Sequence, residues 1–334
     1  MKKNNYSRVC IVYTVYQLFF YLLYSSDKEI KDTFFFFGPG IPISFIKEFP
    51  NSHYFVKCKT TAERRRLRLY LRLFSRIRWP FLTSAEIFGE DHLVFSPGLI
   101  GKRHYTLIED APLILSMYYN SQAYKRETKN NKGIKGVFGR FVYGNTFHFG
   151  RGESNQCEKI LLSQYDESPN LKNKTIEIIS LPTLWNEASV EKRDFILSLF
   201  NITSNDLLIM ENKSIIILTQ PFSIDIKMEE EEQIELYRSI IQKYNQKDIL
   251  LKTHPRDPIN YKEYFPEISI ITKPIPMQLI DIMGIKFKKA VTISSTAVLS
   301  FPYEIEIDWI GTTCNKTLFA YYGDMPLPDK LSCK

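Results

Sequence analysis

Residues 250–258 read LLKTHPRDP, an apolar run that ends in a histidine and two prolines. The run predicts a short buried strand over residues 248–251, which places His254 at a strand exit. In open α/β sheets, ligands collect beyond the carboxyl ends of the strands, so a titratable side chain there is suited to chemistry. Pro255 restricts the backbone of His254 to extended or turn geometry, and the flanking basic residues favour an anionic ligand such as a phosphate. The alternative is a plain loop histidine beside a turn.

Similar apolar runs recur along the chain and alternate with segments of helical pattern. They lie at residues 8–13, 33–37, 53–56, 85–88, 92–95, 104–108, 174–179, 214–219, 268–271, 276–279 and 289–293. This alternation predicts parallel sheets covered by helices, an α/β fold. The polar segment 163–174 is typical of a linker, so we expect two domains, residues 1–165 and 174–334.

The composition of the 334 residues is that of a folded protein, with 44% apolar and 24% charged residues. A formal net charge of +7 indicates attraction to nucleotides, acidic lipids or nucleic acid, and does not choose among them. The 5 cysteines lack metal-ligand spacing, which indicates a reducing compartment and no structural zinc. The apolar stretch at residues 9–24 contains polar side chains and is too short for a spanning helix.

A basic amphipathic helix is predicted over residues 60–81, where apolar residues recur at helical spacing and arginines fill the other faces. Its residues 64–78 would suit an anionic membrane surface. The alternative is an ordinary domain helix with a solvated basic face. We expect no nucleic acid partner, because no aromatic stacking platform accompanies the arginines. The glycine-rich stretch 132–139 lacks known phosphate-loop patterns and is interpreted as a mobile loop.

Candidate catalytic and ligand-binding residues follow two further predicted strands. The strand at residues 104–108 delivers Glu109 and Asp110, and two adjacent carboxylates in a confined site raise the pKa of one toward that of a general base. The strand at residues 289–293 leads into a Ser-Ser-Thr sequence that would cap a following helix, and a capped helix N-terminus can bind phosphate. The alternatives are acidic residues at a helix start and capping without a ligand.

Three motifs therefore follow one another along the chain: Glu109-Asp110-Ala111, His254-Pro255 and Ser294-Ser295-Thr296. They resemble the acidic, His-Pro and Ser-Ser/Thr motifs of the bacterial sialyltransferases of glycosyltransferase family 52, with a more distant likeness to bacterial polysialyltransferases. The segments 12–18 and 218–221 are also similar to the family. Ala111 replaces the family glycine, which disfavours a positive φ there and leaves open whether Glu109 or Asp110 is the base.

The resemblance implies a GT-B fold, with two Rossmann-like domains facing a central cleft. Acceptor would lie mostly on the first domain and CMP-sialic acid mostly on the second. Glu109 would be the general base, and His254 would protonate or hydrogen-bond the departing phosphate. The implied donor-binding residues are Pro255, Ser294, Ser295, Thr296, Gln220 and Pro221. Inversion at the anomeric centre would need neither a metal nor another cofactor.

The resemblance further implies a donor, CMP-Neu5Ac, and a galactose-terminated lipid-linked acceptor, joined in an α-2,3 linkage during lipopolysaccharide, O-antigen or capsule synthesis. Such an enzyme is expected in the bacterial cytoplasm, peripheral on the inner membrane through residues 64–78, and is compatible with a homodimer. Two alternatives stay open. One is a GT-B transferase for another CMP-ulosonic acid or a UDP-sugar, and the other is a non-catalytic membrane-associated glycan-binding protein in which Ala111 marks a decayed site.

Overall fold

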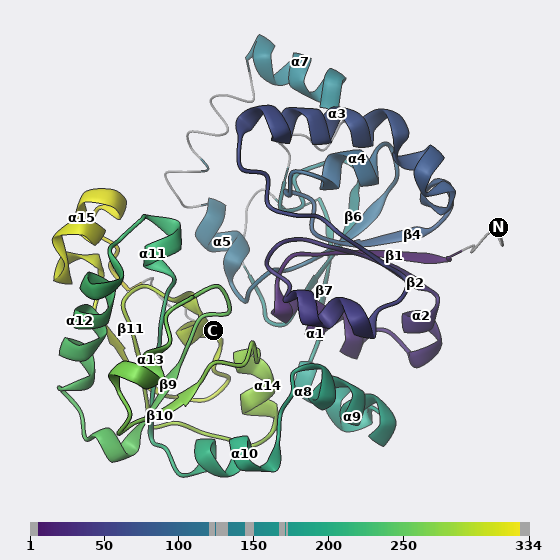
Figure 1. The fold of residues 1–334 in the computed structure, drawn as a ribbon. Helices are drawn as coiled ribbons and strands as arrows, with labels where there is room; N and C mark the ends of the chain where they lie inside the picture. Colours follow the sequence, from purple (N-terminus) through teal and green to yellow (C-terminus); the bar gives the residue numbers. More distant parts are fainter. Residues whose placement is uncertain are drawn as a thin grey trace. The chain divides into compact units, whose positions relative to one another are not determined.

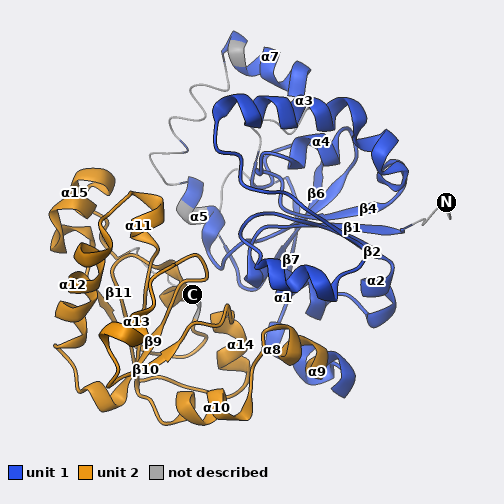
Figure 2. Cartoon of the chain, in the orientation of Figure 1, with its two compact units in different colours: residues 1–192 blue, residues 193–334 orange. Residues whose placement is uncertain are grey.

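The computed structural model describes residues 6–119, 124, 133–143, 150–166, 171 and 173–327. The chain divides into two compact units, residues 1–192 and residues 193–334 (Figure 1 and Figure 2). Each unit is built on a parallel sheet with helices around it, so the predicted α/β class is confirmed.

The described sheet of the first unit has the strand order β3-β2-β1-β4-β5-β6-β7, and its pairings are parallel. The strands are β1 Arg8–Val12, β2 Thr33–Phe37, β3 Ser52–Tyr54, β4 Glu86–Gly89, β5 Tyr105–Ile108, β6 Cys157–Leu162 and β7 Thr175–Ile178. The strand order reverses between β1 and β4. In such sheets the crevice beyond the carboxyl ends at the reversal is the usual place for a ligand.

Helices of the first unit cover this sheet. They are α1 Val15–Tyr24, α2 Asp27–Lys31, α3 Thr61–Arg78, α4 Ser96–Ile100, α5 Ile114–Tyr119, α7 Ile134–Tyr143 and α8 Leu181–Glu187, with 3-10 turns η1 Ile43–Glu48 and η2 Pro80–Thr83. α9 Val190–Leu199 carries the chain into the second unit. Helix α1 is buried from Tyr16 to Leu23, and its first turn is capped by Thr14, whose hydroxyl accepts from the Gln17 amide. Among the described residues, no helix combines the length and apolarity needed to cross a bilayer.

The second unit has the described strand order β10-β9-β8-β11-β12, again with parallel pairings. Its strands are β8 Ile215–Leu218, β9 Ile249–Lys252, β10 Ser269–Ile271, β11 Lys289–Thr292 and β12 Glu306–Trp309. Its helices and turns are α10 Ser204–Glu211, α11 Phe222–Asp225, α12 Glu230–Ile241, η4 Gln246–Asp248, α13 Tyr261–Tyr264, α14 Met277–Ile282, η5 Thr296–Ser300, η6 Thr312–Cys314 and α15 Lys316–Tyr322. The central strand β8 is flanked by β9 and β11, so the carboxyl ends of these three strands share one edge.

Some sequence predictions of secondary structure are wrong. Residues 92–95 form a bend rather than a strand. Their apolar side chains, Leu93 and Phe95, pack into the core from this bend, so the apolar pattern does not report a strand. Residues 276–279 begin helix α14, and residues 134–139 lie in helix α7 rather than in a loop. The strand assigned to the second domain, β7, pairs with β6 in the first unit, and the division into units falls after residue 192.

Candidate active site

Glu109 directly follows β5 and is buried, with 1% of its surface exposed. Its Oε1 accepts a hydrogen bond from the Tyr16 hydroxyl at 2.5 Å and another from the Ser163 amide at 2.8 Å. Its Oε2 is buried and has no hydrogen-bond partner among the described residues. Burial raises the pKa of Glu109 to about 7, although the Ser163 and Tyr16 hydrogen bonds oppose the rise. A carboxyl group with this pKa is suited to accept a proton near neutral pH.

Asp110, the second acid of the motif, has a different environment. Its Oδ1 lies 3.3 Å from Nη1 of Arg151, and its carbonyl accepts from the Thr14 hydroxyl at 3.2 Å. Burial and the neighbouring Glu90 raise the pKa of Asp110, while the Arg151 guanidinium lowers it. Its side chain is 14% exposed. The two acids are thus distinguished by their partners, since Glu109 is held by neutral donors and Asp110 by a cation.

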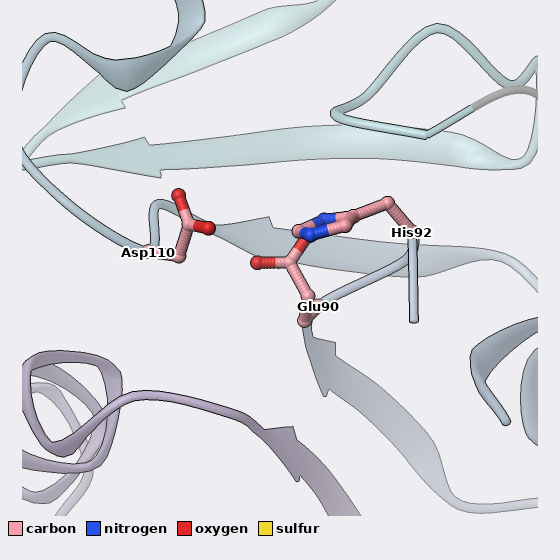
Figure 3. A group of neighbouring side chains, drawn as sticks. All are labelled: Glu90, His92 and Asp110. Atoms are coloured by element: carbon pink, nitrogen blue, oxygen red, sulfur yellow. The ribbon is translucent and has the colours of Figure 1, made fainter. Parts of the chain in front are cut away.

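A second group of charged residues, which the sequence analysis did not select, follows the neighbouring strand β4. Glu90 pairs with Nδ1 of His92 and also accepts from Nε2 of Gln17 at 3.0 Å. Figure 3 shows His92 and Glu90 close to Asp110. Burial disfavours charge on this imidazole, but Glu90 outweighs it and raises the pKa of His92. The sequence could have indicated this group, because two acids and a histidine follow the predicted strand 85–88. The incorrect prediction of a strand at residues 92–95 hid the pattern.

Residues far apart in the sequence hold this cluster in place. Asp91 is buried and accepts hydrogen bonds from the Tyr105 hydroxyl at 2.6 Å and from the Gly152 amide at 2.8 Å. Burial raises the pKa of Asp91 to about 6. Gln17 of α1 donates to Glu90 and also to the carbonyl of Ile108 at 2.9 Å. The polar residue that interrupts the first apolar stretch therefore ties the ends of β4 and β5 together.

Ligand atoms of Glu90, His92 and Asp110 all lie within 4.8 Å of one another, which is a spacing that a metal ion could bridge. Nδ1 of His92 is, however, already paired with Glu90, and the Arg151 guanidinium supplies positive charge beside Asp110. A cation at this point would meet Arg151 at close range. We therefore interpret the group as an ion-pair network.

In the second unit, His254 follows β9, as the sequence predicts. Its amide donates to the hydroxyl of Thr219 at 3.0 Å, and its Nδ1 accepts from the Arg256 amide at 3.1 Å. Burial, together with the positive charges of Arg256 and Lys252, lowers the pKa of His254 to about 4. The imidazole is therefore neutral near pH 7, and the proton belongs on Nε2, because Nδ1 serves as an acceptor. His254 can thus donate a hydrogen bond from Nε2.

Gln220 and Ser294 meet beside it, at the ends of β8 and β11. The amide and the hydroxyl of Ser294 both donate to Oε1 of Gln220, at 3.1 Å and 2.9 Å. The hydroxyl of Thr219, next to Gln220, donates to Asp257 at 2.8 Å while it accepts from the His254 amide. His254, Gln220 and Ser294 are therefore brought to one edge of the sheet, on three adjacent strands.

The other predicted donor-binding residues surround this edge. Pro221 is buried at the start of α11, Pro255 is exposed, and Ser295 and Thr296 are half-buried at the start of η5. The predicted hydroxyl cap is wrong. No side chain caps η5, because the Ser295 amide turns back to the hydroxyl of Thr292 at 2.9 Å and the Ser294 hydroxyl binds Gln220. η5 is a short 3-10 turn, so any phosphate would be held by side chains and single amides.

Two parallel α/β units, each with polar and titratable groups beyond the carboxyl ends of its strands, are the architecture expected of a GT-B fold. The sequence model of glycosyltransferase family 52 matches residues 99–311, and the chain belongs to this family. The chain is therefore a glycosyltransferase, and the resemblance inferred from the three motifs is confirmed.

The chain is also similar in sequence to another bacterial protein and in fold to solved structures. An uncharacterized protein of Haemophilus influenzae is 28% identical over 318 residues, which cover 95% of this chain and 98% of that protein. The fold is similar to the GT-B domain of a sialyltransferase from Photobacterium damselae, with a TM-score of 0.53 and 12% identity, over 90% of each chain. It is also similar to a 2,6-sialyltransferase of a Photobacterium species bound to CMP and lactose, with a TM-score of 0.58 and 13% identity, over 90% of this chain and 71% of that one. At these identities the likeness shows the fold, and the predicted GT-B fold is confirmed.

Proposed function

We propose that this glycosyltransferase is a sialyltransferase, which moves sialic acid from CMP-Neu5Ac to a galactose-terminated acceptor with inversion at the anomeric carbon. The observation that carries the proposal is the arrangement of His254, Ser294 and Gln220 beyond three adjacent strands, where Nδ1 of a neutral imidazole is occupied as an acceptor and Nε2–H remains as its donor. These groups fit a phosphate. The lowered pKa of His254 keeps its imidazole neutral in the absence of a ligand. The family and the fold of its solved neighbours support the same reaction.

In the proposed mechanism, Glu109 accepts the proton of the acceptor hydroxyl on Oε2. Tyr16 and Ser163 occupy Oε1, so they fix the carboxylate and leave the second oxygen available. The acceptor oxygen forms a bond to the anomeric carbon while the bond from that carbon to the CMP phosphate breaks. The leaving phosphate takes the electron pair and receives a hydrogen bond from Nε2 of His254. Attack on the face opposite the phosphate inverts the anomeric centre.

The donor-binding set is completed, in this proposal, by Ser294, Ser295 and Thr296, with Pro221 and Pro255 shaping the two turns. Gln220 holds the Ser294 hydroxyl until a phosphate oxygen competes for it. The imidazole and the hydroxyl groups neutralise the leaving group, so the proposal needs no metal and no other cofactor.

The biological setting is also part of the proposal. We place the enzyme in the cytoplasm of a bacterium, peripheral on the inner membrane through residues 64–78 of α3, acting on a lipid-linked oligosaccharide of lipopolysaccharide, O-antigen or capsule in an α-2,3 linkage. The exposed arginines at positions 64, 65 and 66 and the net charge of +7 support contact with anionic lipid.

Transfer of sialic acid from CMP-Neu5Ac to lactose by the purified chain tests the proposal directly. Calorimetry with CMP and with UDP, run in parallel, measures which nucleotide the second unit binds. We expect transfer, together with CMP binding at least tenfold tighter than UDP binding. Tighter UDP binding, or transfer from another CMP-ulosonic acid alone, would replace the proposed donor. Binding of glycan without any transfer would make the chain a non-catalytic glycan-binding protein.

A further inference from the structure

Helix α7 presents its apolar side chains to solvent. Ile134, Val137, Phe138 and Phe141 are 89%, 57%, 66% and 81% exposed, and their spacing places them on a single face of the helix. On the opposite face, Gly136 and Gly139 are buried. A domain helix normally shows the reverse arrangement, with large apolar residues packed inward and polar residues outward. Among the residues that the structure describes, the outward stripe, Ile134, Val137, Phe138 and Phe141, is therefore an exposed apolar surface.

The buried glycine face of α7 is directed toward the rest of the first unit, where α7 packs against α3 (Figure 1). Helix α3 is itself strongly basic, with arginines at positions 64, 65, 66, 68, 72, 76 and 78 and one acid, Glu63. It also leaves apolar residues in solvent, namely Leu69, Leu73, Phe74 and Ile77 at 44%, 58%, 45% and 74% exposure. Two adjacent helices thus expose large apolar side chains, and one of them adds a concentration of positive charge.

We infer that α7 and α3 form a membrane-docking surface, in which the α7 stripe inserts among the lipids of an anionic bilayer and the exposed α3 arginines, at positions 64, 65, 66 and 78, contact the headgroups. The inference rests on the proposed membrane location and extends it, because it assigns insertion to a helix outside residues 64–78. Interfacial helices bind by burying an apolar face at the headgroup boundary while basic residues attract anionic lipid. Both requirements are met here by neighbouring elements of one unit.

Charge complementarity favours an anionic bilayer over a second copy of the chain. A symmetric contact through this face would bring the arginines of α3 against their own copies, which is repulsive. Anionic phospholipids supply the opposite charge together with an apolar layer that accepts the α7 stripe.

The position of α7 along the chain connects docking with the acceptor. The helix lies between Asp110 and Arg151, whose side chains are paired at the carboxyl edge of the first sheet. The stretch of sequence that contains α7 therefore begins and ends at the acidic cluster. A lipid-linked acceptor would be delivered to the same unit that docks on its membrane.

Flotation of the full chain with vesicles of phosphatidylglycerol and phosphatidylcholine tests the inference against vesicles of phosphatidylcholine alone. We expect wild-type protein to float with the anionic vesicles and the double variant Phe138→Ser, Phe141→Ser to bind them at least tenfold more weakly. The matched control is Leu208→Ser with Phe319→Ser, which removes two apolar side chains of similar exposure, 57% and 51%, from the second unit and should bind within twofold of wild type. Unchanged flotation of the α7 double variant would overturn the inference.

Two further readouts separate this inference from the proposed reaction. Transfer to soluble lactose should be the same in the α7 double variant and in wild type, whereas transfer to an acceptor embedded in vesicles should fall. Phe138→Trp should gain fluorescence quenching by brominated anionic lipids relative to wild type, and its absence would count against insertion. If light scattering showed that wild type is a dimer and the double variant a monomer, the surface would be a contact between copies and the membrane inference would be wrong. Failure of sialyl transfer would leave the vesicle results intact.

Discussion

Tyr16 donates a hydrogen bond to Glu109 at 2.5 Å across 93 positions of sequence, from the first turn of α1 to the end of β5. The bond joins the segment after β1 to the segment after β5, past the intervening strand β4. Oε2 of Glu109 is buried and has no hydrogen-bond partner among the residues that the structure describes, so the proposal assigns the proton to this oxygen. The acid that the proposed reaction uses is thus oriented by the phenol of Tyr16, which lies in the segment 12–18 that resembles the family.

Removing that phenol should change the pH profile. The Tyr16 hydrogen bond lowers the pKa of Glu109, so Tyr16→Phe should raise it. We expect the acidic limb of kcat/KM to move to higher pH, with the maximal rate reduced by a smaller factor. Phe20→Leu, a buried aromatic change on the same helix, serves as the control for packing. An unmoved limb would show that Glu109 is not the group whose ionisation limits the rate.

Replacing the acids one at a time should identify the base. Glu109→Gln keeps the hydrogen bonds at one oxygen and removes the proton acceptor, so we expect kcat to fall at least 100-fold. Asp110→Asn should have the smaller effect, because Asp110 is already neutralised by Arg151. The measurement is steady-state transfer with both substrates varied. The reverse order of the two losses would make Asp110 the base.

The raised pKa of Glu109 also predicts how stability depends on pH. The folded state binds this proton more tightly than the unfolded state, so its stabilisation is complete below the unfolded pKa and is lost as pH rises toward about 7. Glu109→Gln removes the ionisation. Urea unfolding from pH 4.5 to 8 should therefore show a smaller decline in the free energy of unfolding for the variant than for wild type. Parallel curves for the two proteins would contradict this.

Binding of CMP should vary little between pH 6 and 8 through His254. Its lowered pKa of about 4 keeps the imidazole neutral over that range, and protonation at lower pH adds positive charge beside the phosphate. The CMP phosphate titrates in the same way with either protein, so we expect the ratio of CMP affinities of wild type and His254→Ala to stay constant from pH 6 to 8 and to grow only as the solution becomes distinctly acidic. A steep loss of affinity between pH 6 and 7.5, removed by the same substitution, would indicate an ordinary histidine pKa instead.

Ser294 should contribute directly to donor binding. Ser294→Ala removes a hydroxyl that donates to Gln220 and that would turn to a phosphate oxygen, so we expect CMP affinity to fall about tenfold, which corresponds to about 1.4 kcal/mol. Ser239→Ala removes a hydroxyl that bonds the Leu236 carbonyl elsewhere in the same unit and should leave affinity unchanged. Equal effects of the two substitutions would point to a general loss of stability.

The positions at which several strands end could be predicted from the sequence, whereas most of the contacts around those positions could not. Strand β2 was predicted at the residues where it lies, because a run of phenylalanines ended by glycine and proline is typical of a short buried strand. His254 and Glu109 were placed at strand ends for the same reason. Short runs with two or three apolar residues were ambiguous, and residues 276–279 became a helix because Met277 and Leu279 pack inward from it.

Pairs that depend on the order of strands could not be predicted. Gln17 meets Glu90 across 73 positions and Asp110 meets Arg151 across 41, and both distances become short only after the sheet is assembled. The neutral state of His254 follows from burial, which a single sequence does not report. The resemblance to family 52 supplied the roles of residues, while local patterns supplied only their positions.

The ion pair of Asp110 and Arg151 closes the loop of chain that carries α5 and α7, so the sheet ends of β5 and β6 are joined independently of what lies between them. Within this excursion α5 is tied to the sheet, because Leu115 and Tyr119 pack in its core, whereas α7 packs on α3. The part of the excursion around α7 is therefore the place where members of the family could differ in sequence while Glu109 and Asp110 keep their positions at the end of β5.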